Sequence, residues 1–384
     1  MDCLDEIKDP RDACNGTRYD FREMLVITIS ASLCDMNTCE DFSFWVEARQ
    51  PWLKKSLPLK NGIPFSTTFY RLFRVLDPKQ FEAFFRRWVS EIVPAAAPPG
   101  QIAINGKTIR GSADGACRPV QIVNAFSSDL GIVFGQECVE QKSNEITVIP
   151  EPLEALYAKG FLVSIDASKE IASGYAMGCQ KAIARKIIDK GGDYLLMVKG
   201  NQPALLDKVS AACTTESRAD MPRFEHLDTS HGRVVTQLTW TAPATHAAID
   251  MQEWSHAMVR QVGGKTSDLE QRYYISSREL TPEEIAKAVR AHWAMENQLH
   301  WMLNVNFSEG ACTVKKDNAP EILSLIRRVV INILSRDTTQ PSFTKKKLSK
   351  RQKREFANRD ESIMRSILGL QPLSCPSAKT LPWL

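Results

Sequence analysis

The chain has 384 residues, of which 43% are hydrophobic and 24% are charged, and its formal net charge is +4. These values match an ordinary globular protein long enough for two or three domains, and they exclude a chain too polar to form a core. Because the chain is only mildly basic, affinity for a polyanion must come from local patches rather than from its overall charge.

The N-terminal sequence and the cysteines predict a soluble intracellular protein. Residues 1–6 lack the basic flank and apolar run of a signal peptide. The longest apolar stretch, 24–34, is shorter than the roughly 20 residues that a membrane span needs. The ten cysteines lack close pairing, which favours reduced thiols over a disulfide framework. We therefore expect a cytoplasmic protein without a membrane partner.

Residues 1–94 are expected to form a helical domain that binds DNA. Hydrophobic periodicity and chain breaks predict four helices, at 21–33, 40–49, 67–76 and 78–93. Ser66 or Thr67 is the expected N-cap of the third helix. The last two helices carry Arg71, Arg74, Arg86 and Arg87. Such a cluster is compatible with DNA binding and equally with a solvated helical face.

A break rich in Ala and Pro before residue 101 predicts a domain boundary, after which strands and helices alternate. The strands are expected at 101–105, 120–127, 132–139, 161–165 and 193–198, and the helices at 151–158 and 180–190. The second and third strands are joined by a hairpin turn. This order is typical of an α/β fold of the ribonuclease H-like type, a mixed sheet with helices on both faces. Residues 101–222 would form its first part.

A β-rich insertion is expected at 223–278, because the segments 234–240, 253–262 and 271–276 alternate in hydrophobicity. Core helices at 279–337 would follow. The first begins at Thr281 and Pro282, a cap and a first-turn proline, and is expected to run through Glu296 to about residue 301.

The last predicted helix, 319–336, precedes a basic tail at 338–384 that contains clusters of lysine and arginine. The tail is expected to be a flexible, sequence-independent DNA contact. The alternative is a disordered segment that only improves solubility.

Three oxygen-bearing side chains are candidates for one catalytic pocket: Asn105, Asp166 and Glu296. The first two end apolar strands, and the third lies on a helix rich in Trp and Leu. Metal-assisted phosphoryl transfer needs hard oxygen ligands around two cations about 4 Å apart, one activating the nucleophile and one stabilising the leaving oxygen. The pattern predicts such a site, with an amide in the first position where this chemistry needs a carboxylate.

Several motifs resemble bacterial insertion-sequence transposases of the DDE class, in the group that includes the H-repeat-associated proteins. The motifs are INGKTIRGS at 104–112, KSNEITVIP at 142–150, VKGNQ at 198–202, SHGR at 230–233, RYYISS at 272–277 and HWAMENQLHW at 292–301. The resemblance covers about residues 4–337. It implies a ribonuclease H-like fold and a site with two Mg²⁺ (or Mn²⁺) ions in active relatives. It also implies a homo-oligomer that cuts terminal inverted repeats and joins them to target DNA.

Residue by residue, the resemblance matches the family's second aspartate to Asp166 and its glutamate to Glu296, which would bind metal. The family's first aspartate corresponds to Asn105. An amide cannot bridge two cations as a carboxylate does, and losing about 4 kcal/mol of transition-state stabilisation would slow turnover roughly a thousandfold. We therefore expect a transposase with severely impaired catalysis and largely intact DNA binding. The alternative is a non-catalytic DNA-binding relic that occupies element ends.

Other departures from the family lower the negative charge near the site. Residues 168–176 interrupt a string that the family writes as Asp-Ala-Met-Gly-Cys-Gln. Asn304 stands where these proteins usually carry Asp, and Gly310 stands where an acidic residue is common. The sequence leaves open whether the interruption forms an earlier helix start or a loop that overhangs the site.

Polar residues that flank the expected site are candidates for neutralising phosphates and positioning a DNA strand. They are Lys107, Arg110, Lys199, Asn201 and Gln202. The alternative is ordinary solvated charge on loops. A different class of site is also open: His292, Glu296 and His300 are spaced four apart, so they share one helical face and could bind zinc or another transition metal.

Overall fold

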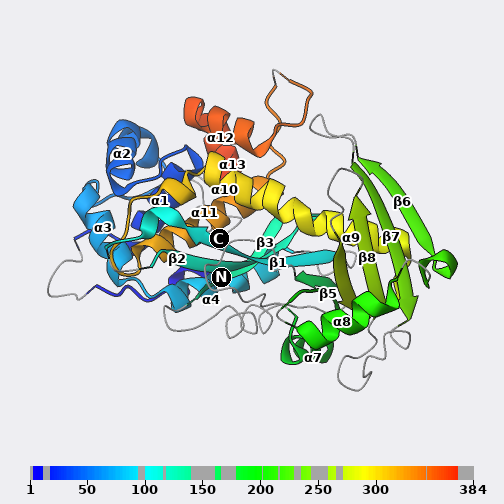
Figure 1. Cartoon of the computed structure of the whole chain (residues 1–384). Coiled ribbons are helices and arrows are strands. Elements are labelled where there is room, and N and C mark those ends of the chain that lie inside the picture. Colours follow the sequence, from blue (N-terminus) through cyan, green and yellow to red (C-terminus); the bar gives the residue numbers. More distant parts are fainter. Residues whose placement is uncertain are drawn as a thin grey trace.

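The computed structural model is built around one mixed β-sheet with helices on both faces (Figure 1). The structure describes residues 3–11, 18–93, 100–115, 118–139, 161–165, 179–200, 202–214, 217–228, 235–243, 258–264, 271–342 and 344–370. Within these stretches, none of the helices combines the length and the apolar character that crossing a membrane requires.

Four α-helices form the N-terminal region, as predicted. They are α1 (Phe21–Leu33), α2 (Cys39–Leu53), α3 (Ser66–Val75) and α4 (Pro78–Ile92), preceded by a 3₁₀ turn, η1 (Cys3–Glu6). The prediction that Ser66 or Thr67 caps α3 is wrong. Phe65 is the N-cap, without a side-chain bond, because Ser66 is already helical and its hydroxyl lies past the cap position.

The first five strands confirm the ribonuclease H-like fold class. They are β1 (Gln101–Ile109), β2 (Val120–Ser127), β3 (Ile132–Val139), β4 (Leu162–Ile165) and β5 (Asp193–Val198). The first three are antiparallel neighbours, and β4 and β5 join β1 in parallel. β1 is longer than predicted, because its pairing with β2 continues to Ile109. The predicted helix at 151–158 lies outside the described residues.

The predicted β-rich insertion extends this same sheet. Its strands are β6 (Arg223–Asp228), β7 (Val235–Pro243), β8 (Met258–Gly264) and β9 (Arg272–Ser276). β9 pairs antiparallel with β5, and β8, β7 and β6 follow outward, so the nine strands have the order β3-β2-β1-β4-β5-β9-β8-β7-β6. A short 3₁₀ turn, η3 (Ser217–Asp220), precedes β6, a strand that the sequence did not indicate separately.

Helices cover both faces of the sheet, as expected. On one face α7 (Lys181–Asp189) and α8 (Pro203–Ala212) pack against Ile102 and Ile104 of β1. Ala103, which points to the other face, belongs to the hydrophobic cluster around α11 (Ala319–Arg336). α9 (Pro282–Ala294) packs against β4 and β5 on that second face.

The helix that carries Glu296 is not a regular α-helix throughout. α9 begins at the predicted cap, where Thr281 and Glu284 form a capping box. It passes without a break into a π-helical segment, η6 (Met295–His300), and then into α10 (Trp301–Val305). In the π turn the backbone N–H of Trp301 bonds to the carbonyl of Glu296. Such turns are rare and occur often at functional sites.

One hydrophobic cluster joins the N-terminal helices to the core sheet. α11 is buried along most of its length and lies between β2 and β3 on one side and α1, α3 and α4 on the other. Asn332 of α11 donates to the Val133 carbonyl and accepts from its N–H, both at 2.8 Å. The helix is therefore fixed to β3 by hydrogen bonds as well as by apolar contacts.

The C-terminal segment is folded where the structure describes it, so the prediction of a flexible or disordered tail is wrong there. Residues 350–370 form a helical hairpin of α12 (Lys350–Arg359) and α13 (Glu361–Leu368), which lies against α1 and α11 (Figure 1). The basic run forms an amphipathic helix in which Lys353, Arg354 and Ala357 are buried. Periodicity, rather than total charge, decides the structure of this segment.

Arg354 fixes the hairpin to the end of α1. Its guanidinium donates to the carbonyls of Ser32 and Leu33 and to the carboxylate of Asp35, at 3.0, 3.3 and 3.0 Å. The guanidinium also lies 3.8 Å from the centroid of the Phe307 ring. A cation at the last carbonyls of a helix satisfies acceptors that have no partner within the helix.

A buried ion network joins β1, β2 and α11 beside the turns η2 (Arg110–Ser112) and η7 (Glu309–Ala311). The Glu309 carboxylate is fully buried and lies 2.6 Å from Arg328 Nη1 and 3.1 Å from Lys107 Nζ. Arg328 Nε donates to Asn124 Oδ1 at 2.7 Å. Burial opposes ionisation, but the charges of Arg328 and Lys107 outweigh it and hold the pKa of Glu309 well below its ordinary value.

We expect Glu309→Gln to destabilise the fold by about 3 kcal/mol at pH 7, because it leaves two buried cations without their counter-charge. Since folding lowers the pKa of Glu309, its contribution is present above the unfolded-state pKa of about 4.3 and is lost as pH falls. Urea unfolding at pH 7 and at pH 3 measures both effects. The loss should shrink at the lower pH.

The control is Glu283→Gln, which removes an exposed pair with Lys287 on α9. We expect a change below about 0.5 kcal/mol for this variant. Equal effects of the two substitutions would contradict the role assigned to Glu309.

We expect Arg354→Met to lower stability by about 2 kcal/mol, because buried carbonyls lose their donor. The variant should also expose the segment after α11 to limited proteolysis. Arg351→Met, on the exposed side of α12, is the control and should change neither measurement. Equal protease resistance of wild type and Arg354→Met would contradict this docking role.

Candidate active site

Asn105 lies inside β1, at the point where β4 ends beside it. On one side Asn105 pairs with Asn124 of β2. On the other side Ile104 pairs in parallel with Ile165, the last described residue of β4. Asp166, the second of the three predicted catalytic residues, follows Ile165 in the chain. It lies outside the described residues, as do residues 168–176. The sheet register therefore puts Asn105 at the carboxyl end of the strand that precedes Asp166.

The structure brings Asn105 and Glu296 together across 191 positions of sequence. Asn105 Nδ2 donates to Glu296 Oε1 at 2.7 Å. Asn105 Oδ1 accepts the Gly106 N–H at 2.8 Å, which fixes the amide with its NH₂ group toward the carboxylate. His300 Nδ1 lies 3.1 Å from Glu296 Oε2. Both carboxylate oxygens thus have partners, although the Glu296 side chain keeps about a third of its surface exposed (33%).

A short hydrogen-bonded chain holds α9 against the sheet below this pair. His292 Nδ1 bonds to Ser164 Oγ at 2.8 Å. Gln101 Nε2 donates both to Ser164 Oγ and to the Ala288 carbonyl, each at 2.7 Å. All of these side chains are buried. They link β1, β4 and α9, the elements around the site.

The zinc alternative is not supported. In the part of the chain that the structure describes, which includes His292, Glu296 and His300, no group of three His, Cys, Asp or Glu side chains could hold a metal ion. Glu296 and His300 contact each other in the π turn, with His300 Nδ1 3.1 Å from Glu296 Oε2. His292 instead bonds to Ser164.

The donor set of the described residues does not fit a site for two cations. Asn105 turns a hydrogen-bond donor toward Glu296, and its only oxygen accepts the Gly106 N–H. Residue 105 in this orientation offers no oxygen to an ion between the two side chains. The arrangement satisfies the Glu296 carboxylate with an N–H group, where a carboxylate at 105 would repel it and would need a cation between them.

The polar residues that were predicted to contact DNA differ in their exposure and in their partners within the chain. Arg110 is exposed in η2, and Lys199 is partly exposed after β5. Gln202 precedes α8 and donates to the Cys179 carbonyl at 3.1 Å. Asn201 lies outside the described residues. Lys107 is buried and paired with Glu309, a position that does not suit a contact with phosphate.

Two of the departures from the family pattern are in contact with each other. Asn304 Oδ1 accepts from Lys107 Nζ at 2.8 Å. A Cβ atom added to Gly310 would lie 3.0 Å from the same oxygen. A larger side chain at 310 therefore requires Asn304 to shift, so the residues at positions 304 and 310 depend on each other.

Three of the four N-terminal arginines are engaged within the molecule. Arg74 pairs with Asp317 at 2.6 Å, Arg86 with Glu137 of β3 at 2.7 Å, and Arg87 with Glu6. Arg71 is exposed. Arg74 and Arg86 thus join N-terminal helices to later parts of the chain, whereas Arg87 joins α4 to η1 within the N-terminal region.

Sequence reasoning missed Glu309 and Arg328. One signal was available: Arg327 and Arg328 interrupt an otherwise apolar helix, and buried cations require partners. The partner itself could not be found, because Glu309 lies in an irregular segment that has no periodicity.

The chain is similar to known transposase families and proteins. The family model described as "Transposase DDE domain" matches residues 96–333, and the one described as "DDE_Tnp_1-associated" matches residues 1–89. YncI of Escherichia coli O157:H7, named as a candidate transposase, is 36% identical over 87% of this chain and 86% of its own length. YhhI of Escherichia coli strain K12, named as an H repeat-associated candidate transposase, is 34% identical over 92% of this chain and 93% of its own length.

Among solved structures, a piggyBac transposase in a synaptic complex with hairpin DNA aligns with 96% of this chain and 77% of its own chain. The TM-score is 0.45 and the identity is 12%. The sequence relatives and the family match over more than half of the chain agree with the motifs and with the strand order. The chain belongs to the family of transposases with a DDE domain.

Proposed function

We propose that this chain is a DNA transposase by descent that binds DNA but has severely impaired strand cleavage. The observation that carries the proposal is the 2.7 Å hydrogen bond from Asn105 Nδ2 to Glu296 Oε1. An amide supplies no negative charge, and here it satisfies the carboxylate that it faces. The family normally uses divalent metal ions, and Mg²⁺ or Mn²⁺ are the ions that we propose for active relatives. Because the described donor set does not fit two ions, we propose no metal-dependent step for this copy.

The catalytic residues that we propose are Asn105, Asp166 and Glu296, and such a site would have one charge fewer than the chemistry needs. Phosphoryl transfer concentrates negative charge on the reacting phosphate, and two cations normally balance it. Removing one bridging carboxylate weakens cation binding and transition-state stabilisation together. A loss of about 4 kcal/mol corresponds to a roughly thousandfold slower reaction.

The proposed partners are DNA molecules, the terminal inverted repeats of the element and a target DNA, bound by a homo-oligomer. Arg110, Lys199 and Gln202 are the described candidates for contacts with phosphate, together with Asn201. We leave Lys107 out of this set, because its ammonium group is buried against Glu309. Lys107 instead contributes to the position of β1.

The second candidate function is a non-catalytic protein that occupies element ends or competes with active copies. The Asn105–Glu296 bond favours this candidate too, because it stabilises the site without a cation. Binding without cleavage under all metal conditions would separate it from a slow enzyme.

We expect Asn105→Asp to raise cleavage of a plasmid that carries the element ends, by up to about a thousandfold in Mg²⁺ or Mn²⁺. The physical reason is the restored carboxylate opposite Glu296. The matched control combines Asn105→Asp with Glu296→Gln and should return cleavage to the background rate. Efficient cleavage by the unmodified chain, with no gain from Asn105→Asp, would contradict the proposal.

We expect binding to duplex DNA to weaken linearly as the logarithm of salt concentration rises. Arg110→Gln and Lys199→Gln should each lower the magnitude of the salt slope by about 1, because each removes a phosphate contact. Lys287→Gln on the exposed side of α9 is the control and should leave the slope unchanged. Fluorescence anisotropy over a salt series measures these slopes. Slopes that do not differ among the variants would reject the assigned contacts.

A further inference from the structure

The helix that carries Glu296 also carries two exposed apolar side chains. Trp301 and Val305 have 52% and 56% of their surface exposed. Trp301 closes the π turn that begins at Glu296, and Val305 follows one α-helical turn later. Residues one turn apart lie on the same side of a helix. Glu296, Trp301 and Val305 therefore follow one another along one face.

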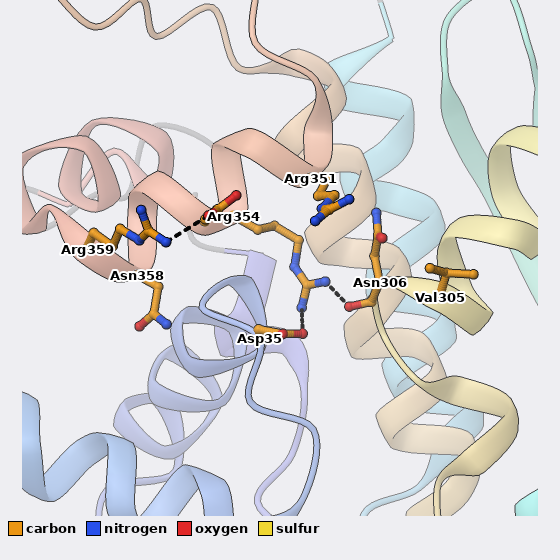
Figure 2. Close-up of a pocket in the computed structure, with 8 residues that line it drawn as sticks. Asp35, Val305, Asn306, Arg351, Arg354, Asn358 and Arg359 are labelled. Carbon is orange, nitrogen blue, oxygen red and sulfur yellow. Dashed lines mark hydrogen bonds and ion pairs between the residues drawn. The ribbon is translucent and has the colours of Figure 1, made fainter.

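This face ends at a cavity of about 470 Å³ between α10, α12 and the end of α1, which we call the α12 pocket (Figure 2). The residues that line it are Asp35, Val305, Asn306, Arg351, Arg354, Glu355, Asn358 and Arg359. Val305 belongs both to the apolar face and to the pocket. The exposed helix face and the pocket thus form one continuous surface that begins at Glu296.

The pocket presents arginine side chains from one helix. Arg354 is held in place by Asp35 and by the Asn306 carbonyl (Figure 2). Arg359 pairs with Glu355 at 2.8 Å on the exposed side. Arg351 is exposed, and among the residues that the structure describes it has no ion-pair partner. The guanidinium of Arg351 is therefore available to an anion at the edge of a rigid, polar wall.

We propose that this surface binds a DNA strand with unpaired bases, with one base stacked on Trp301 and its phosphates on Arg351 and the α12 pocket. Trp301 lies on the helix face that leads through Val305 to the arginine-lined α12 pocket. Single-stranded nucleic acid is bound by such a combination, with aromatic rings stacking on the bases and positive charge contacting the backbone. A base inside a duplex cannot present its flat face to Trp301, because its neighbours cover it. The inference rests on the proposed function as a DNA-binding protein.

The dimensions suit a short piece of strand. From Glu296 to Val305 a regular α-helix would rise about 13 Å at roughly 1.5 Å per residue, and the π turn makes the actual rise somewhat shorter. At about 3.4 Å per nucleotide in one strand this corresponds to roughly four stacked nucleotides. A strand of that length would reach from the Asn105–Glu296 pair to the α12 pocket.

The test compares binding of the full chain to a labelled 20-nucleotide thymidine strand and to a duplex of mixed sequence, by fluorescence anisotropy. We expect Trp301→Ala to weaken single-strand binding about tenfold. The affinity of the Trp301→Ala variant for duplex DNA should change less than twofold. The Trp301→Phe variant should retain most of the affinity for the single strand. Arg351→Gln should weaken single-strand binding as well, with a smaller dependence on salt.

Two matched controls use exposed residues of the same types. Phe44→Ala removes an exposed aromatic side chain of α2, and Arg185→Gln removes an exposed arginine of α7, a helix well apart from α12 in Figure 1. Both should leave single-strand binding unchanged. Sedimentation of each variant measures self-association at the same protein concentrations.

The inference is overturned if Trp301→Ala leaves single-strand affinity unchanged, or if it weakens duplex binding to the same extent. It is also overturned if the substitution changes only self-association, which would assign the apolar face to a second copy of the chain. Failure of the unmodified chain to bind duplex DNA would instead contradict the proposed function. Loss of single-strand binding alone, with duplex binding intact, supports the inference.

Discussion

A buried carboxylate, Glu309, holds together the elements around the Asn105–Glu296 pair. Its ion pairs reach Lys107 on β1 and Arg328 on α11, and Arg328 continues to Asn124 on β2. Lys107 and Asn105 belong to the same strand, two residues apart, so the network that fixes one also fixes the other. Buried charges are stable only when paired, and this pairing requires β1, β2 and α11 to keep one relative position.

The charges around Glu309 and around Glu296 are balanced in different ways. On the buried side, two cations share the single carboxylate of Glu309. On the more open side, Asn105 is neutral and donates to Glu296. A protein of this family with a carboxylate at position 105 would face a repulsion there that only cations can relieve. In this chain the hydrogen bond removes the repulsion, and the site is stable by itself. The amide at position 105 therefore stabilises the Glu296 carboxylate without a cation.

The basic residues of the C-terminal hairpin have different roles, which depend on whether each is buried or exposed. The run of lysines and arginines at its start resembles a flexible tail when only charge is counted. Arg354 instead caps α1 and packs on Phe307, while Arg351, one turn earlier, stays exposed at the α12 pocket. Because Arg354 is buried and Arg351 is exposed, one side of α12 packs against the fold and the other side is open to a ligand. The helix thus connects the fold of the N-terminal region to the surface that begins at Glu296.

The sequence by itself determined the order of helices and strands, the ribonuclease H-like class and the family, because these depend on local periodicity and on motifs. It also singled out Asn105 and Glu296, since a strand and a helix each presented an oxygen ligand in the expected order. Only the tertiary structure decided that the two side chains share a hydrogen bond, that a π turn replaces the regular helix, and that Glu309 neutralises Lys107 and Arg328. These features join residues far apart in the chain, and their geometry depends on sheet register and helix phase, which no short segment encodes.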